Sequence, residues 1–306
     1  MIMLLNTGCN LRCKFCTLHR ENKQLSFKAA IRIIDEAQGL GVKDIVLTGG
    51  EPFLHPHFFE IAKHVKEKGL DLIVTTNGTR IKANIQKIIE AKIDSINISI
   101  DGTEKTHDSI RGKAGAYQQA LEGIKLLLEK KVGKEVKVNY VVTKQNVRDL
   151  IPTYNFVTSL GANFDFWPVN DAPNMYIQSE KDSEAYLEAI QHIAKREGKK
   201  FLDKKEYYIK ALDYHAGKKM CTRCLGLKDS FGINADGELV ACCLWGDKDL
   251  SVGNAVSKPL AELWNSNRAH ELRHRIYNQG CLAKCYNHSL YEFNRKTGES
   301  FEVRRG

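Results

Sequence analysis

Nine cysteines fall into two groups along the chain, and this grouping is typical of thiolate ligation to a metal centre. Three lie at Cys9, Cys13 and Cys16, and the other six lie between Cys221 and Cys285. Buried structural cysteines would be spread through the core, whereas several thiolates must converge on one centre to bind a metal or a cluster. An odd number of cysteines without a signal peptide indicates reduced thiols, so we expect a cytoplasmic protein.

The first group supplies three thiolates from one loop, with the spacing Cys-x3-Cys-x2-Cys over Cys9, Cys13 and Cys16. A [4Fe–4S] cluster has four irons and usually four cysteine ligands. Three ligands leave one iron with an open position, and an open position is where a metal site can do chemistry. The alternative is a structural zinc site, for which His19 could supply the fourth ligand.

The elements that must hold this loop alternate between strand and helix up to about residue 170. Apolar runs with β-branched residues predict strands at 2–5, 44–47, 70–75, 95–100, 136–142 and 164–167. Helical periods lie between them, most clearly at Leu121, Ile124, Leu127 and Leu128. Six such units predict parallel strands joined by right-handed crossovers, as in a partial or full barrel.

Polar or glycine-rich residues end three of the predicted strands. The segments are Thr48-Gly49-Gly50-Glu51, Thr75-Thr76-Asn77-Gly78 and Ser99-Ile100-Asp101-Gly102. Functional residues in such folds collect at the C-terminal ends of the strands. The cysteine loop follows the first strand, so we expect it to share one face of the fold with these three segments.

Several of these motifs together resemble the radical S-adenosylmethionine (SAM) superfamily. The resemblance rests on the loop from Cys9 to Cys16, on Gly49-Gly50-Glu51-Pro52, and on Ser99-Ile100-Asp101-Gly102 with Arg111 downstream. It implies an α/β fold, a partial (β/α)6 TIM-like barrel over residues 1–178. It also implies that the open iron of a [4Fe–4S] cluster chelates SAM, whose reductive cleavage gives a 5′-deoxyadenosyl radical that abstracts a substrate hydrogen.

The resemblance also implies roles for individual residues. Cys9, Cys13 and Cys16 would hold the SAM-cleaving cluster. Gly49, Gly50 and Glu51 would meet the methionyl amino group of SAM, and Arg111 would meet its carboxylate. Ser99 would contact the ribose or methionyl part, with Asp101 nearby. The remaining cofactor-binding residues would be Phe15 of the same loop, and Asn77 and Val141 at SAM polar and adenine groups. Taken alone, residues 49–52 favour a plain strand–helix turn, and Ser99, Asp101 and Asn77 are equally typical of helix capping.

The second group of cysteines predicts a second metal site. Cys224, Cys242, Cys281 and Cys285 would close it, with Cys242 at the end of a hairpin that turns at Asp236-Gly237. This arrangement resembles the twitch domain, a shorter relative of the SPASM domain, and implies one auxiliary [4Fe–4S] cluster. A zinc site with four thiolates is the alternative. We expect linker helices over 179–220 and this small α+β domain over 221–306.

Two cysteines exceed that ligand set. Cys221 is an alternative ligand to Cys224, and Cys243 could replace Cys242 or donate a hydrogen atom to a product radical. The simpler interpretation of both extra residues is a small buried apolar side chain.

We therefore expect a radical SAM oxidoreductase that oxidises a small metabolite such as a sugar, an aminocyclitol or a nucleotide derivative. A maturase of a ribosomally made peptide is the alternative. No leader-binding domain is expected before the barrel, because the first cluster cysteine is already Cys9, and this favours the small molecule. An alternative of another class is a non-catalytic iron–sulfur or zinc-binding protein.

Composition limits the partners. The 306 residues are 42% hydrophobic and 27% charged, an ordinary globular balance, and no apolar run is long enough for a membrane span. The net charge of +9 permits an acidic partner, but no stripe of basic and aromatic residues favours nucleic acid. By the resemblance, the electron donor would be a flavodoxin or a ferredoxin.

Overall fold

The computed structural model describes residues 1–306 except 17, 19–21, 171, 219–225, 243–247 and 280–306. Within the described residues the strands form one nine-stranded sheet in the order β6-β5-β4-β3-β2-β1-β7-β8-β9. The first six are β1 (Ile2–Leu4), β2 (Asp44–Thr48), β3 (Asp71–Thr76), β4 (Ser95–Ser99), β5 (Glu135–Val142) and β6 (Asn163–Pro168). Each is parallel to its neighbour. The sheet is not closed, which confirms the predicted partial barrel.

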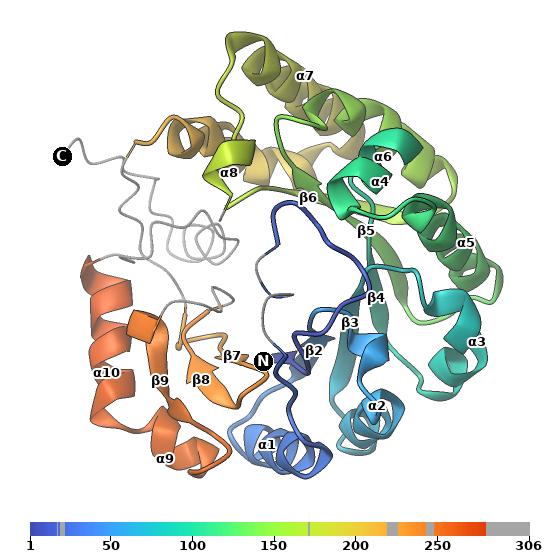
Figure 1. The fold of residues 1–306 in the computed structure, drawn as a ribbon. Coiled ribbons are helices and arrows are strands. Elements are labelled where there is room, and N and C mark those ends of the chain that lie inside the picture. The colour runs from blue at the N-terminus through green and yellow to red at the C-terminus, as the bar shows by residue number, and fades with distance from the viewer. Residues whose placement is uncertain (17, 19–21, 171, 219–225, 243–247, 280–306) are drawn as a thin grey trace.

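Helices cover the outer face of this curved sheet, as Figure 1 shows. They are α1 (Phe27–Gly39), α2 (Phe58–Glu67), α3 (Ile81–Glu90), α4 (Glu104–Arg111), α5 (Ala116–Glu129) and α6 (Leu150–Ser159). Their apolar residues recur at helical spacing: Phe58, Ile61, Ala62 and Val65 are all buried on one face of α2. Burying that face against the sheet stabilises the helix far more than its own propensity does.

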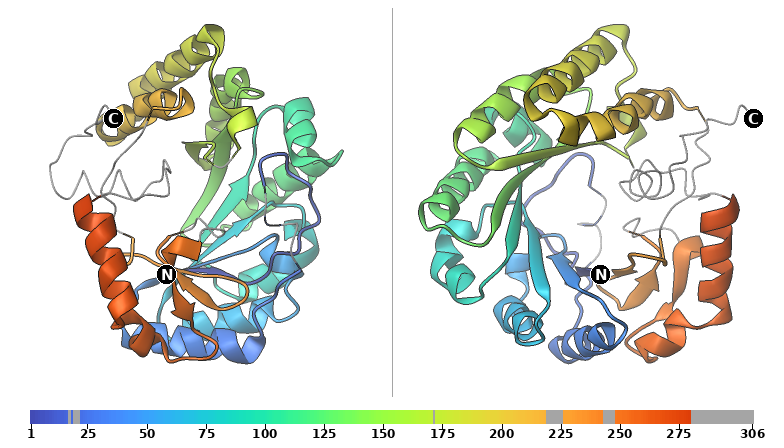
Figure 2. Two further views of the ribbon diagram at one scale, coloured as in Figure 1. Left: turned by 60° about the vertical axis from the view of Figure 1, so that its left-hand side comes forward. Right: turned by 180° about the vertical axis from the view of Figure 1, so that it is seen from behind.

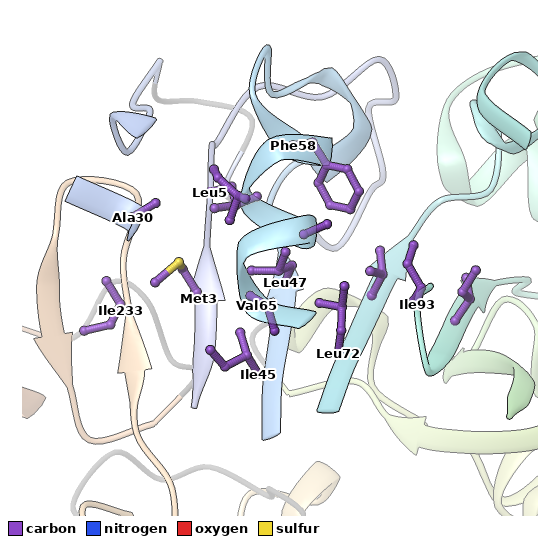
Figure 3. Packing of buried hydrophobic residues seen from close by; sticks show 14 of the residues in the cluster. Met3, Leu5, Ala30, Ile45, Leu47, Phe58, Val65, Leu72, Ile93 and Ile233 are labelled. Carbon is purple, nitrogen blue, oxygen red and sulfur yellow. The ribbon is translucent and has the colours of Figure 1, made fainter. Parts of the chain in front are cut away.

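The main core lies between the sheet and these helices. Strand residues alternate, so that Ile45 and Leu47 of β2 and Leu72 of β3 point to the core and are fully buried. Figure 3 shows them packed beside Val65 of α2. The intervening strand residues therefore point to the inside of the barrel, where Thr75, Asn97 and Ser99 are half-buried.

Two longer helices follow β6. They are α7 (Glu180–Glu197) and α8 (Lys199–His215), which pack against each other; α8 also packs against β6, and Tyr186 of α7 contacts Phe166 of β6. Aromatic rings fill their contact, with Phe166 of β6 stacked on Tyr208 at a centroid distance of 4.3 Å. Both helices lie in the region expected to hold linker helices; the sequence pattern of the second is clear only from about residue 206, whereas α8 begins at Lys199, directly after Gly198.

The last strands extend the barrel sheet beyond β1. The strands β7 (Gly232–Ile233) and β8 (Glu238–Val240) form the predicted hairpin, and β9 (Ser251–Asn254) pairs with β8. β7 runs parallel to β1, with Met3 opposite Ile233, and Figure 3 shows both side chains in the main core. Local sequence did not predict this pairing.

The helices that follow complete this part of the fold. They are α9 (Leu260–Trp264) and α10 (Asn267–His274), followed by a π-helical turn over Arg275–Gln279. Ser266 separates them, because its hydroxyl caps α10 by accepting a hydrogen bond from the N–H of Ala269. Figure 2 shows these helices beside β7, β8 and β9, next to α1. None of the described helices combines the length and apolar character of a membrane span.

Candidate active site

The cysteine loop follows β1 and is bound to the end of α4 through its backbone. Arg12 N–H donates to the carbonyl of Arg111 at 3.1 Å, and Lys14 N–H donates to that of Ile110 at 2.9 Å. Gly112 makes this approach possible: its φ is +68°, and a Cβ there would lie 2.5 Å from the Arg12 carbonyl oxygen. These hydrogen bonds fix the backbone of the cysteine loop to the end of α4.

The two glycines after β2 pack against the start of the same loop. Gly50 N–H donates to the Asn6 carbonyl at 2.8 Å, and Glu51 N–H donates to the Gly8 carbonyl at 2.9 Å. A Cβ on Gly50 would lie 2.2 Å from the carbonyl oxygen of Gly8. Only glycine therefore fits there, and the two backbones lie side by side.

One cavity of about 130 Å³ lies where these segments meet, at the C-terminal ends of β2, β3 and β4. It brings together most of the predicted residues. Its lining consists of Cys9, Cys13, Cys16, Phe15, Gly49, Gly50, Asn77, Ser99 and Arg111, together with Leu11, Thr48, Thr75 and Thr76. A second cavity, beside the N-terminal halves of β5 and β6, is lined by none of the described residues that the sequence singled out.

Glu51 lies beneath this cavity rather than in its lining, and it is fully buried. One carboxylate oxygen accepts hydrogen bonds from the hydroxyl of Thr76 at 2.7 Å and the N–H of Phe53 at 3.3 Å. The other accepts from the N–H of Asn77 at 2.8 Å. Burial raises the pKa of Glu51 to about 7, although these donors oppose the rise. The Glu51 side chain therefore joins the ends of β2 and β3. The two glycines before it line the cavity, and Glu51 does not.

Asp101 and Arg111 form a buried ion pair, with 2.6 Å between Oδ2 and Nε. Asp101 Oδ1 accepts a hydrogen bond from the N–H of Val141 at 2.8 Å, so this carboxylate joins the end of β4 to β5. Burial raises the pKa of Asp101, and the guanidinium opposes that rise. Asp101 and Val141 do not line the cavity; the Val141 side chain packs instead near Val169 and Met175.

Arg111 itself lines the cavity. Its Nη1 donates to the sulfur of Cys13 at 3.7 Å, and its guanidinium lies 5.4 Å from the centre of the Phe15 ring. Burial would lower the pKa of Arg111, but Asp101 and Cys13 raise it, so the side chain stays charged. Burial raises the pKa of the Cys13 thiol, and Arg111 opposes that change.

Three residues that hold this site escaped sequence analysis. The amide of Asn146 donates to the carbonyls of Asp101 at 3.0 Å and Val141 at 2.9 Å. His107 Nδ1 accepts from the N–H of Asp101 at 3.0 Å, and burial lowers the pKa of His107 to about 3, so the ring is neutral. Thr76 lies in one of the polar segments that end a predicted strand, but nothing in the sequence indicated its own role.

The C-terminal cysteines are described only in part. Cys242 follows β8, is half-buried and packs against the main core. Cys221, Cys224, Cys243, Cys281 and Cys285 lie outside the described residues, and so does His19. The predicted second site is therefore represented in the structure by Cys242.

Two family models match this chain. The one described as the radical SAM superfamily matches residues 3–157, and the one described as an iron-sulfur cluster-binding domain, SPASM, matches residues 215–286. An AdoMet-dependent heme synthase of Methanosarcina barkeri is 28% identical over 86% of this chain and 80% of its own length. A probable GTP 3′,8-cyclase of Sulfurisphaera tokodaii is 26% identical over 80% of each chain.

Solved structures with the same fold include native anSMEcpe with bound AdoMet and Kp18Cys peptide. The TM-score is 0.69 at 19% identity, covering 89% of this chain and 82% of that one. This likeness concerns the fold.

Proposed function

The chain belongs to the radical SAM superfamily, and from this premise we propose that the cavity at the cysteine loop binds and cleaves SAM in order to oxidise a small polar metabolite. Family membership implies a SAM-binding [4Fe–4S] cluster and SAM, and the SPASM match implies auxiliary iron–sulfur ligation. One observation carries the proposal: three thiols, the Gly49-Gly50 backbone and Arg111 line a single cavity.

The donor set fits the cluster. Cys9, Cys13 and Cys16 would hold it, because all three residues line one cavity. Cysteine thiolates are the usual ligands of a [4Fe–4S] cluster. When bound, the clusters and SAM supply one-electron cleavage of the sulfonium, hydrogen-atom abstraction and a one-electron acceptor.

The residues around the sulfurs would bind and orient SAM. The backbone of Gly49 and Gly50 lines the cavity, and its carbonyls would accept hydrogen bonds from the ammonium group of SAM. The charged Arg111 would donate to its carboxylate, because a guanidinium presents several N–H groups in one plane. Ser99 would donate to or accept from the ribose hydroxyls. Asp101 and Glu51 act from outside the cavity by holding the strand ends that carry these groups.

The C-terminal region would form a cap with its own cluster. We assign Cys224, Cys242, Cys281 and Cys285 as its ligands, with Cys221 as the alternative to Cys224. Cys243 would lie free as a hydrogen donor. The proposed boundaries are 1–178 for the barrel, 179–220 for the linker helices and 221–306 for the cap. A cap that excludes water protects reactive species from side reactions.

The inner face of the barrel supports a polar substrate. Side chains alternate along each strand, so five polar residues point inward: Thr75, Asn97, Ser99, Asn139 and Asp165. The strand register places neighbours of this set opposite each other, as Thr75 with Asn97, Ser99 with Asn139, and Asn139 with Asp165. Asn97 Oδ1 is buried and accepts no hydrogen bond from the described residues. These neutral donors and acceptors, together with the carboxylate of Asp165, suit the hydroxyl and amino groups of a sugar, an aminocyclitol or a nucleoside.

Tetrapyrroles fit this face less well. They carry several carboxylates and would need cations along the inner face, where Lys137 is paired with Glu135 at 3.2 Å. The heme synthase relative therefore supports the radical chemistry more than the substrate.

A ribosomally made peptide is the second candidate substrate. anSMEcpe, which shares this fold, is described with a bound peptide. β6 lies at one edge of the described sheet, and an extended peptide can pair with such an edge.

The test is anaerobic reconstitution followed by measurement of 5′-deoxyadenosine. We expect reductant-dependent SAM cleavage in the wild type and in Cys242→Ala, and none in Cys9→Ala. Each variant should lose about half of the iron and sulfide, because each disrupts one of two [4Fe–4S] sites. Full iron loading without 5′-deoxyadenosine would instead support a non-catalytic iron–sulfur protein, and zinc in the loop would refute the ligand assignment.

A further inference from the structure

The three sulfurs of the cysteine loop have different hydrogen-bond environments. Cys9 Sγ accepts from the N–H of Leu11 at 3.4 Å and from the side-chain amide of Asn77 at 3.7 Å. Cys13 Sγ accepts from Arg111 at 3.7 Å. Among the described residues, none donates to Cys16 Sγ. The thiolate of Cys9 therefore has the most donors.

The Asn77 amide is held in place from several sides. Its Nδ2 also donates to Asn10 Oδ1 at 2.9 Å, and its Oδ1 accepts from the Thr79 hydroxyl at 2.7 Å and the Thr79 N–H at 3.0 Å. Asn10 Nδ2 in turn donates to the Thr79 hydroxyl at 2.8 Å. The backbone N–H of Asn77 is bound by Glu51.

The backbone after Asn77 adds to this rigidity. Gly78 has a φ of +80°, and a Cβ there would lie 2.7 Å from Ile98 and 2.9 Å from Ala120. The turn therefore packs closely against β4 and α5 and holds Asn77 at the end of β3. A side chain with this many partners keeps its N–H aimed at the sulfur without further ordering.

We propose that Asn77 is a positioning residue that sets the reduction potential of the cluster held by Cys9, Cys13 and Cys16, by donating its amide N–H to the Cys9 thiolate. Hydrogen bonds to the sulfurs are one of the factors that determine the potential of an iron–sulfur cluster. The reduced cluster carries one more negative charge, so a donor stabilises it more than the oxidised cluster. The bond from Asn77 therefore raises the potential, and its loss lowers it.

This inference rests on the proposed ligand set, and the experiment separates the two. The reconstituted holoprotein is titrated with a reductant while the cluster is followed by electron paramagnetic resonance. The signal that changes on addition of SAM identifies the cluster with an open iron. Wild type is compared with Asn77→Leu, which removes the amide, and Asn77→Gln, which keeps an amide N–H. Iron is measured in every sample.

We expect Asn77→Leu to have wild-type iron content and a more negative midpoint potential, with the ratio of reduced to oxidised cluster at fixed solution potential lowered on the order of threefold. Asn77→Gln should recover part of that change. Asn84→Leu, which removes an amide on α3 that donates to the Arg80 carbonyl at 2.8 Å, is the matched control and should leave the potential unchanged.

The outcomes are distinct. A wild type without a SAM-responsive signal would overturn the proposed function. A normal wild type and an unchanged potential in Asn77→Leu would overturn this inference alone. If Asn77→Leu loses iron, Asn77→Asp decides, because its carboxylate keeps the bonds from Thr79 but offers no N–H to sulfur. Loss of iron in both variants would overturn the inference, since the amide would then serve assembly and not the potential.

Discussion

The raised pKa of the buried Glu51 carboxyl group allows a quantitative prediction of how stability depends on pH. Its pKa is raised by burial from 4.5 to about 7 in the folded protein. The folded state therefore binds a proton more tightly than the unfolded state between these two pH values. The stability that this proton contributes is fully present below pH 4.5 and is lost as the pH rises through about 7. At about 1.4 kcal/mol for each tenfold change in the protonation equilibrium, the loss is about 3 kcal/mol.

Glu51→Gln tests this value, because glutamine does not titrate. Its NH2 group would replace one oxygen that accepts from Thr76 or Asn77, which costs about 1–3 kcal/mol at low pH. We therefore expect the variant to be less stable than wild type at pH 5. By pH 8.5 this difference in free energy of unfolding should vanish or reverse in sign, because only the wild type loses about 3 kcal/mol of stability.

The assay is urea unfolding of the metal-free protein at the two pH values. Glu67→Gln is the matched control, because Glu67 lies on α2 with its side chain 57% exposed. It should follow wild type at both pH values. A wild-type advantage over Glu51→Gln that is equal at pH 5 and pH 8.5 would show that Glu51 titrates at its ordinary pKa, and the account of its burial would be wrong.

Two further predictions concern the walls of the cavity. Gly50→Ala should displace the cysteine loop and reduce iron retention, because a Cβ would lie 2.2 Å from the Gly8 carbonyl oxygen. Gly39→Ala is the control and should retain wild-type iron, because a Cβ there meets nothing within 4 Å. Equal iron in both variants would contradict the packing argument. Arg111→Lys should weaken SAM binding about tenfold in equilibrium dialysis, because lysine loses the planar group that contacts Asp101 and Cys13 together. Arg148→Lys, at an exposed ion pair with Asp182, should bind SAM as wild type does.

The barrel could be predicted from the sequence because its strands carry their own signal. Apolar and β-branched runs placed all six strands within one or two residues of their observed bounds, from Ile2–Leu4 to Asn163–Pro168. Gly69 and Gly133 follow helices and have positive φ, a conformation that glycine adopts readily, so glycines in the sequence mark where these helices stop. Alternation of strand and helix then leaves few topologies, because the crossovers are right-handed.

Other features depend on contacts between distant residues. β7 contains two residues, Gly232 and Ile233, and nothing near them indicates that they pair with β1. The start of α8 was difficult to predict because the lysines around residue 200 are typical of a solvated linker. Lysine is nevertheless a good helix former, and the helix includes them. The pattern of Phe201 and Tyr208, which pack inward, was the available signal.

The site shows the same division between local and distant information. Sequence motifs identified the glycines and Arg111 that line the cavity, but they suggested that Glu51 would meet a ligand directly. In the structure two of the three donors to Glu51, Thr76 and Asn77, come from the last residue of β3 and the residue after it, 25 and 26 residues further along the chain. Only the folded chain brings these groups together, so the burial of the carboxylate and its raised pKa could not be predicted from the motif.

Two buried carboxylates perform the same task at different strand ends. Glu51, after β2, accepts from the N–H of Asn77 at the end of β3, and Asp101, after β4, accepts from the N–H of Val141 in β5. The C-terminal ends of parallel strands have no further ladder partners, so a carboxylate there replaces a missing backbone acceptor. Each carboxylate also fixes a residue that faces the cysteines: Glu51 binds the N–H of Asn77 beside Cys9, and Asp101 forms an ion pair with Arg111 beside Cys13. The acidic residues of these motifs therefore act on the chemistry by holding the strand ends and the groups that touch the sulfurs.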